Sequence, residues 1–175
     1  ALNLVTTFLN PEDYVLIPHD CYGGTIRLFS KLSERGLLRT VYVNQGDLEA
    51  VQQTVNKYNP KMVLVESPSN PLLRVVDIQA LSKITRGNDA LLVVDNTFLS
   101  PIFQTPFKLG ADLVIHSTTK YINGHSDVVG GVVVAKTKAL HQTMQEWANT
   151  LGLSGAPFDS YLTLRGLRTL KLRMH

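Results

Sequence analysis

The chain has 175 residues, 44% of them hydrophobic and 18% charged, and a formal net charge of +3 at pH 7. Disordered chains combine low hydrophobicity with high charge, so this composition predicts a globular protein, and the length suits a single domain. The positive charges are scattered, without the basic run and interleaved aromatic residues of a nucleic-acid-binding surface.

Short apolar runs alternate with amphipathic stretches along the chain, after a helix-like segment at residues 1–10. Runs rich in Val, Ile and Leu predict six strands: Tyr14–Pro18, Arg39–Val43, Met62–Glu66, Leu91–Asp95, Leu113–His116 and Val128–Ala135. Helical spacing lies at Gly24–Glu34, Asp47–Tyr58, Asp77–Arg86 and Thr137–Asn149, with Asp47 and Asp77 as expected N-caps. We therefore expect strands buried on both faces, each followed by a crossover helix. This is a three-layer α/β fold with a mostly parallel sheet and helices on both faces.

Other features concern the compartment and the ends of the chain. No apolar stretch is long enough to span a bilayer, and the single cysteine, Cys21, cannot form an internal disulfide. A cytoplasmic location is therefore expected. The chain lacks an initiator Met and ends in a helical pattern without a stop signal, so we expect it to be a fragment of a longer protein.

Polar residues follow the fourth and fifth predicted strands, at the edge of the sheet where ligands bind in folds of this kind. Asp95 ends one strand, while Ser117, Thr118, Thr119 and Lys120 follow the next. A lone aspartate after a strand is usually a turn residue, and a lone lysine is usually a solvated surface group. An acid, several hydroxyls and an amine at one sheet edge instead indicate a phosphate-containing cofactor that is bound through a lysine.

Pyridoxal phosphate meets these requirements. Lys120 would join the aldehyde of the cofactor as a Schiff base. The cofactor acts as an electron sink when its ring nitrogen is protonated, and the carboxylate of Asp95 would favour that protonated form.

Five motifs in chain order extend this interpretation: YGGT, VESPSNP, VVDNTFLSP, LGADLVIHSTTKYINGHSDVVGG and FDSYLTLRGLRTL. Together they resemble the Cys/Met metabolism family of pyridoxal-phosphate enzymes over essentially the whole chain, which is more specific than any single motif. The resemblance implies the large domain of the fold-type I transferases, which are aspartate aminotransferase-like. Residues 1–175 would form a single, partial cofactor-binding domain without the N-terminal arm and the C-terminal small domain.

The same resemblance implies roles for residues of the last two strands. Lys120 would be the catalytic lysine that carries the cofactor, and Asp95 would pair with the ring nitrogen. Ser117 and Thr119 would bind the cofactor phosphate. The arginine that binds the substrate carboxylate in this family would lie beyond His175, outside this chain.

Two further cofactor-binding residues are implied in earlier loops. Tyr22 would stack on the cofactor ring and assist proton movement, although a partly buried core tyrosine is the simpler interpretation. Asn70 would bond the ring oxygen, although turn asparagines are common. The Ser67–Pro68 and Asn70–Pro71 peptides are candidates for the cis form.

Within the family, the runs SPSNPLLRVVDI and NTLGLSGAPFDSYLTLRGLRTL resemble bacterial enzymes that perform γ-replacement. These exchange the acyl group of O-succinyl-L-homoserine for L-cysteine and give L-cystathionine in methionine biosynthesis. The implied partners are such amino-acid substrates and further copies of the chain in a homotetramer, without nucleic acid or membrane. γ-Elimination from cystathionine and sulfhydrylation of an O-acylhomoserine stay open, because the same motifs serve both. Gly24 stands where methionine γ-lyases carry a cysteine, which argues against that activity.

Other classes of protein fit these residues less well. An inactive fragment, or a module for folding or assembly, is opposed by the intact Lys120, Asp95 and Tyr22. A nicotinamide-binding domain should show G-x-G-x-x-G after its first strand, and YGGTIR does not match. The spacing of His and Cys fits no metal site, so no metal is expected.

Overall fold

The structure is a computed structural model that describes all residues from Ala1 to His175. One sheet contains six strands in the order β2-β1-β3-β4-β5-β6. The strands are β1 (Tyr14–Pro18), β2 (Arg39–Val43), β3 (Met62–Glu66), β4 (Leu91–Asp95), β5 (Leu113–Ser117) and β6 (Gly131–Ala135). β1 to β5 are parallel to one another, and β6 pairs antiparallel with β5. The predicted α/β fold with a mostly parallel sheet is confirmed.

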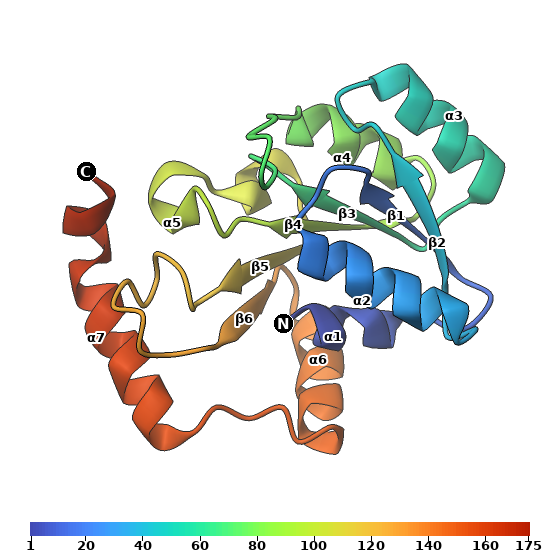
Figure 1. Cartoon of the computed structure of the whole chain (residues 1–175). Helices are drawn as coiled ribbons and strands as arrows, with labels where there is room; N and C mark the ends of the chain where they lie inside the picture. The colour runs from blue at the N-terminus through green and yellow to red at the C-terminus, as the bar shows by residue number, and fades with distance from the viewer.

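Helices cover both faces of this sheet, as Figure 1 shows. α3 (Leu48–Tyr58) and α4 (Ile78–Arg86) lie on one face, while α1 (Leu2–Val5), α2 (Gly23–Glu34) and α6 (Lys138–Thr150) lie on the other. The remaining helical segments are η1 (Thr6–Phe8), α5 (Ser100–Phe103), η2 (Pro106–Leu109) and the long α7 (Pro157–Met174). None of the helices combines the length and the hydrophobicity that crossing a membrane requires.

The core is divided into two layers by the alternation of side chains along each strand. In β1, Val15 and Ile17 belong to the cluster beneath α1, α2 and α6, whereas Leu16 belongs to the cluster beneath α3 and α4. β3 and β5 divide their apolar residues in the same way. Because both faces of these strands are covered, their sequences are almost uninterrupted runs of apolar residues.

The helix starts follow the capping residues that the sequence predicts. Asp47 accepts a hydrogen bond from the Ala50 N–H at the start of α3, and Asp77 accepts one from the Ala80 N–H at the start of α4. Each carboxylate satisfies a backbone donor that has no partner inside the helix. Both predicted N-caps are confirmed.

The expectation of a crossover helix after every strand is wrong for the last pair. β5 and β6 are joined by the loop 118–130, and β6 begins at Gly131 instead of Val128. An antiparallel neighbour needs no helix to return the chain, and Gly130 bonds Thr119 in the loop instead of extending β6. The expectation that the strands are buried on both faces is wrong for the two edge strands, where Tyr42 of β2 and Val132 of β6 are exposed.

Candidate active site

Four parallel strands end at one edge of the sheet. Glu66, the last residue of β3, pairs in register with Asp95, the last residue of β4, and Asp95 pairs with Ile115 of β5. The loop after β1 carries Tyr22, and the turn after β5 carries Lys120. Charged groups are costly in the interior of a covered sheet, and the two acids stand at the ends of their strands, beside a cavity.

A cavity of about 610 Å³ opens at this edge of the sheet. Its wall includes all six residues that the sequence analysis expects at the site: Tyr22, Asn70, Asp95, Ser117, Thr119 and Lys120. Glu66, the first three residues of the chain and the Gly130–Gly131 pair also line it. The volume lies in the range of about 300–1,000 Å³ that is typical of small-molecule sites.

Asp95 is half buried, and its neighbour Thr97 holds one of its oxygens. The Thr97 N–H and hydroxyl both donate to Asp95 Oδ1, at 3.0 and 2.5 Å, and Thr97 Oγ1 accepts the Ser117 N–H at 2.9 Å. Burial raises the pKa of Asp95, while the two bonds from Thr97 lower it. No Lys, Arg or His side chain forms an ion pair with it. Such a carboxylate favours a cationic ligand atom, and the protonated ring nitrogen of pyridoxal phosphate fits this requirement.

Lys120 lines the same cavity from the turn after β5. Its side chain is exposed and forms no ion pair with any carboxylate of the chain. The amine is therefore accessible to an aldehyde in the cavity.

The two hydroxyls that are expected to bind phosphate differ in their present bonds. Thr119 Oγ1 donates to the Gly130 carbonyl at 3.2 Å and accepts the Gly130 N–H at 2.9 Å. Ser117 also lines the cavity, and its hydroxyl forms no such hydrogen bond. Ser117 is thus ready to donate to a phosphate oxygen, whereas Thr119 must first release its bond to the Gly130 carbonyl.

Tyr22 is at the N-cap position of α2, and 48% of it is exposed, so it is not a core tyrosine. A Cβ atom at Gly24 would lie 2.4 Å from Tyr22 Cε1, which means that the ring packs directly against this glycine. The second glycine of the YGG motif therefore leaves room for the ring in its present position. The aromatic face of Tyr22 is available to a flat ligand in the cavity.

Asn70 lies in the loop between β3 and α4. The Ser67–Pro68 and Asn70–Pro71 peptides of this loop are both cis, as the sequence analysis predicts. The Asn70 side chain lines the cavity. Its backbone N–H donates to Glu66 Oε1 at 2.6 Å.

Two residues of the site were missed by sequence reasoning. Glu66 contacts the backbone of both Tyr22 and Asn70, and Thr97 connects Asp95 with Ser117. Glu66 carries the same sequence signal as Asp95, because it too is an acid at the end of an apolar strand. Thr97 has no comparable signal, since a threonine two residues beyond an aspartate is common in turns.

Two arginines of α7 bond to the segment that follows Lys120. Arg165 pairs with Asp127 at 2.7 Å, in the loop that follows the lysine. Arg173 donates to the carbonyls of Tyr121 and Ile122, at 2.7 and 3.3 Å. α7 thus holds the segment next to Lys120.

The sequence also matches a known family and several known proteins. The sequence profile of the family described as Cys/Met metabolism PLP-dependent enzyme matches residues 1–175. Cystathionine γ-synthase of Escherichia coli K12 is 58% identical over 175 residues, which cover 99% of this chain and 45% of that protein. The chain thus spans less than half the length of this curated relative.

Relatives with other names follow at lower identity. Cystathionine β-lyase of Coxiella burnetii is 44% identical, over 99% of this chain and 45% of its own length. Cystathionine γ-lyase of Bacillus subtilis is 41% identical, over 99% of this chain and 46% of its own length. Among solved structures, cystathionine γ-synthase of Xanthomonas oryzae pv. oryzae, in complex with aminoacrylate and cysteine, matches with a TM-score of 0.95 and 52% identity. That match covers 98% of this chain and 44% of the solved one.

Proposed function

The chain belongs to the Cys/Met metabolism family of PLP-dependent enzymes, and on this premise we propose that it forms the cofactor-binding part of a cystathionine γ-synthase. The proposed reaction replaces the acyl group of O-succinyl-L-homoserine by the thiol of L-cysteine and gives L-cystathionine. The observation that carries the proposal is the single cavity that contains Lys120, Asp95, Tyr22, Asn70, Ser117 and Thr119. The 58% identity to the E. coli enzyme of that name supports the choice within the family.

The proposed roles follow from the chemistry of each side chain. Pyridoxal phosphate, when bound, supplies an electron sink for negative charge that develops at the substrate Cα. Asp95 would hold a proton on the ring nitrogen, because its carboxylate forms no ion pair with a Lys, Arg or His side chain. Lys120 Nζ would be the covalent attachment point and, once free, would move protons at Cα and Cβ of the substrate.

The remaining residues that line the cavity would orient the bound cofactor. Ser117 and Thr119 would donate their hydroxyl protons to phosphate oxygens. Asn70 would donate to the ring oxygen, and the ring of Tyr22 would cover one face of the pyridine. Together these contacts would fix the cofactor with its aldehyde carbon toward Lys120.

A lyase is the second candidate function, and the relatives named cystathionine β-lyase and cystathionine γ-lyase favour it. Each of these relatives aligns with 99% of the chain at 41% identity or more. The residues that line the cavity in this chain would serve replacement and elimination alike, because both begin with loss of the Cα proton. The choice between them therefore needs a product measurement.

The proposal is tested with the full-length protein and its Lys120→Ala variant. We expect the wild type to show a visible absorption band from bound pyridoxal phosphate, and the variant to lose that band together with at least about 10³-fold of its activity. O-succinylhomoserine with L-cysteine should then give cystathionine. A wild type without the band would overturn the cofactor assignment. Formation of 2-oxobutanoate from cystathionine, in place of synthesis, would show a γ-lyase.

We also propose that the full-length enzyme is a homotetramer that acts in the cytoplasm. The tetramer follows from the family resemblance, and the cytoplasmic location follows from the lone, buried Cys21. Both stay predictions.

A further inference from the structure

We propose that Glu66 is a positioning residue of this site, whose two carboxylate oxygens hold the backbones of Tyr22 and Asn70 and thereby set where both side chains lie. The inference rests on the proposed function, because it takes Tyr22 and Asn70 as ligands of the cofactor. It gives Glu66 no direct contact with substrate.

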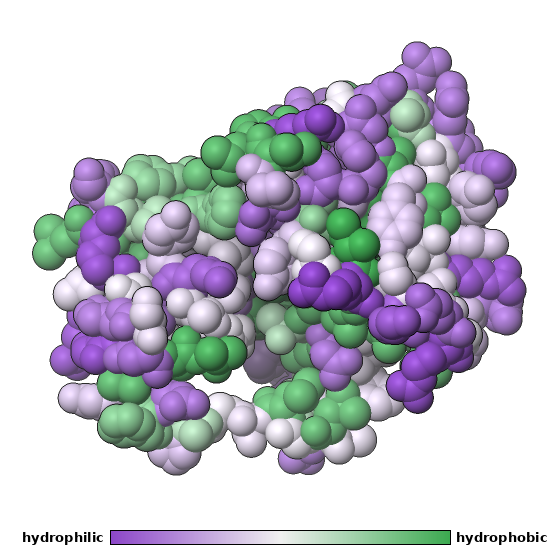
Figure 2. Space-filling view, viewed as in Figure 1, coloured by the Kyte–Doolittle hydropathy of each residue, from purple (hydrophilic) through white to green (hydrophobic).

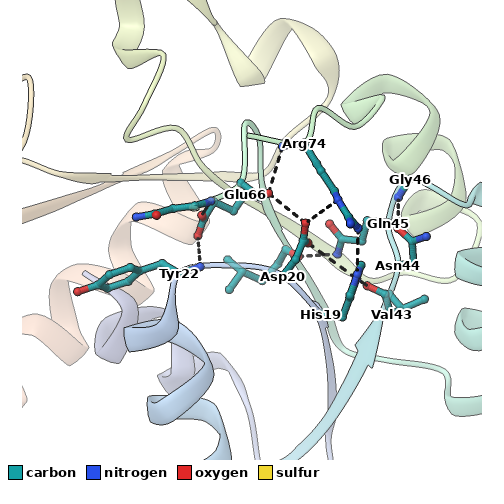
Figure 3. A network of polar contacts seen from close by, with 12 residues as sticks. His19, Asp20, Tyr22, Val43, Asn44, Gln45, Gly46, Glu66 and Arg74 are labelled. Atoms are coloured by element: carbon teal, nitrogen blue, oxygen red, sulfur yellow. Dashed lines mark hydrogen bonds and ion pairs between the residues drawn. The ribbon is translucent and has the colours of Figure 1, made fainter. Parts of the chain in front are cut away.

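The geometry is that of a bridge between two loops. Glu66 Oε2 accepts the Tyr22 N–H at 3.0 Å, and Glu66 Oε1 accepts the Asn70 N–H at 2.6 Å. Figure 3 shows the Glu66 side chain joined to the Tyr22 backbone by a dashed line, to the left of the other labelled polar residues. Tyr22 belongs to the loop after β1 and Asn70 to the loop after β3, so one side chain connects both.

The bridge requires two acceptors and no donor. A carboxylate offers acceptors only, whereas a glutamine would turn its NH₂ group toward one of the two N–H donors. Tyr22 and Asn70 both line the cavity, and Glu66 accepts a hydrogen bond from the backbone N–H of each. Loss of one bond would therefore leave a partly buried N–H without its protein partner and let one cofactor-binding loop shift.

A second carboxylate lies close by without sharing this role. Asp20 accepts a bond from the Ser69 hydroxyl at 3.1 Å and lies 3.7 Å from the guanidinium of Arg74 (Figure 3). Asp20 supports the base of the same loop, but it bonds neither the Tyr22 N–H nor the Asn70 N–H. Asp20→Asn therefore removes a neighbouring negative charge while keeping the bridge intact.

The protonation of Glu66 connects the bridge to pH. Burial raises the pKa of Glu66 to about 7; the bonds from Tyr22 and Asn70 lower it, and the charges of Asp95 and Asp20 raise it. Cys21 and Arg74 are the other titratable or charged groups near Glu66. Below pH 7 the carboxyl gains a proton, which turns one acceptor oxygen into a donor and weakens one of the two bonds. Above pH 7 both bonds are fully available.

The experiment uses the full-length wild type, Glu66→Gln and Asp20→Asn. The dissociation constant of pyridoxal phosphate is measured by titration of each apoprotein between about pH 6 and pH 8. Amide hydrogen exchange of the apoproteins is followed in the segments that contain Tyr22 and Asn70. This second measurement reports the two bonds directly, without cofactor and without activity.

We expect Glu66→Gln to raise the dissociation constant at least about tenfold at pH 8 and to speed exchange in both segments. The wild type should lose affinity as the pH falls through 7 more steeply than Glu66→Gln does. Asp20→Asn should retain the slow exchange at the Tyr22 amide and the loss of affinity on acidification, with that loss displaced to lower pH because a charge that raises the pKa of Glu66 is removed.

Three results would overturn the inference. The first is amide exchange in Glu66→Gln that equals that of the wild type. The second is faster exchange in Glu66→Gln without any loss of cofactor affinity. The third is that Asp20→Asn has the same effects as Glu66→Gln. A wild type that takes up no pyridoxal phosphate would instead overturn the proposed function, and the inference with it. The wild-type measurement thus tests the proposed function, and the variant measurements test the role of Glu66.

Discussion

Asp95 is half buried, Thr97 bonds one of its oxygens, and no Lys, Arg or His side chain forms an ion pair with it. Thr97 also accepts the Ser117 N–H, so a single hydroxyl connects the acid expected at the ring nitrogen with a residue expected at the phosphate. Because a hydroxyl both donates and accepts, it can join the ends of β4 and β5 in this way. The spacing between the two groups therefore depends on Thr97.

Thr97→Val tests this connection. The valine side chain has a similar shape but no hydroxyl, so it neither donates to Asp95 nor accepts from Ser117, and only the backbone N–H of residue 97 still donates to Asp95. The pKa of Asp95 should therefore rise further above its usual value. A neutral carboxyl would then persist to higher pH and pair poorly with a cationic ring nitrogen. We expect the dissociation constant of pyridoxal phosphate in the full-length protein to rise about tenfold, more at low pH than at high pH.

Thr97→Ser is the matched control, because it keeps the hydroxyl and removes only a methyl group. Its dissociation constant should stay within about twofold of the wild type. Equal affinities for Thr97→Val and the wild type, at every pH, would show that the hydroxyl does not matter to the site.

α7 packs against the segment that follows Lys120. Arg173 donates to the Tyr121 and Ile122 carbonyls, and Gly166 faces the same segment. A Cβ atom at Gly166 would lie 2.4 Å from the Asn123 carbonyl oxygen and 2.5 Å from that of Ile122. The glycine in the middle of this helix is thus required by close packing.

Gly166→Ala should therefore destabilise the full-length protein by about 1–3 kcal/mol, although alanine in a helix is ordinarily better than glycine by about 1 kcal/mol. The clash is with backbone atoms, which cannot move aside as a flexible side chain can. Chemical denaturation measures the free energy of unfolding.

Gly87→Ala serves as the comparison for that variant. A Cβ atom there would meet its nearest neighbour, the Ile84 carbonyl oxygen, at an ordinary 3.5 Å, and the backbone is right-handed. We expect no loss of stability from it. If Gly166→Ala were as stable as Gly87→Ala, the close contact between α7 and the lysine segment would be refuted.

On the scale of the whole molecule, apolar side chains gather outside the core along α7. Phe158, Tyr161 and Leu172 are 68%, 64% and 81% exposed. Figure 2 shows hydrophobic residues along the lower margin of the view, near the connection between α6 and α7. Exposed apolar patches mark surfaces that another part of a protein or another subunit covers. This agrees with the proposed assembly into a tetramer.

Residues 1–175 produced alone should therefore self-associate, with an apparent mass that rises above 19.4 kDa as the concentration increases. The double variant Phe158→Ser/Leu172→Ser should shift the distribution at least about twofold toward the monomer, because it removes two of the most exposed apolar groups. Sedimentation velocity measures this distribution. Leu37→Ser, at another exposed leucine outside α7, should leave association unchanged. A chain that stays monomeric at every concentration would contradict the prediction.

Much of this protein is determined by the sequence alone, because the forces involved are local. Alternating and continuous apolar runs place β1 to β4 at the predicted residues, and Asp47 and Asp77 cap their helices through bonds three residues ahead. The end of each strand also indicates where polar side chains meet. That is why residues chosen from motifs line one cavity.

Only the tertiary structure decided the remaining features, which depend on contacts between distant positions. The antiparallel β6, the bridge from Glu66 to Tyr22 and the packing of Gly166 against Asn123 all join segments that no local pattern connects. An acid at a strand end can be recognised in a sequence. Which backbone donors it reaches is decided by the register of the sheet and the paths of two loops, because a hydrogen bond forms only within about 3 Å of its partner.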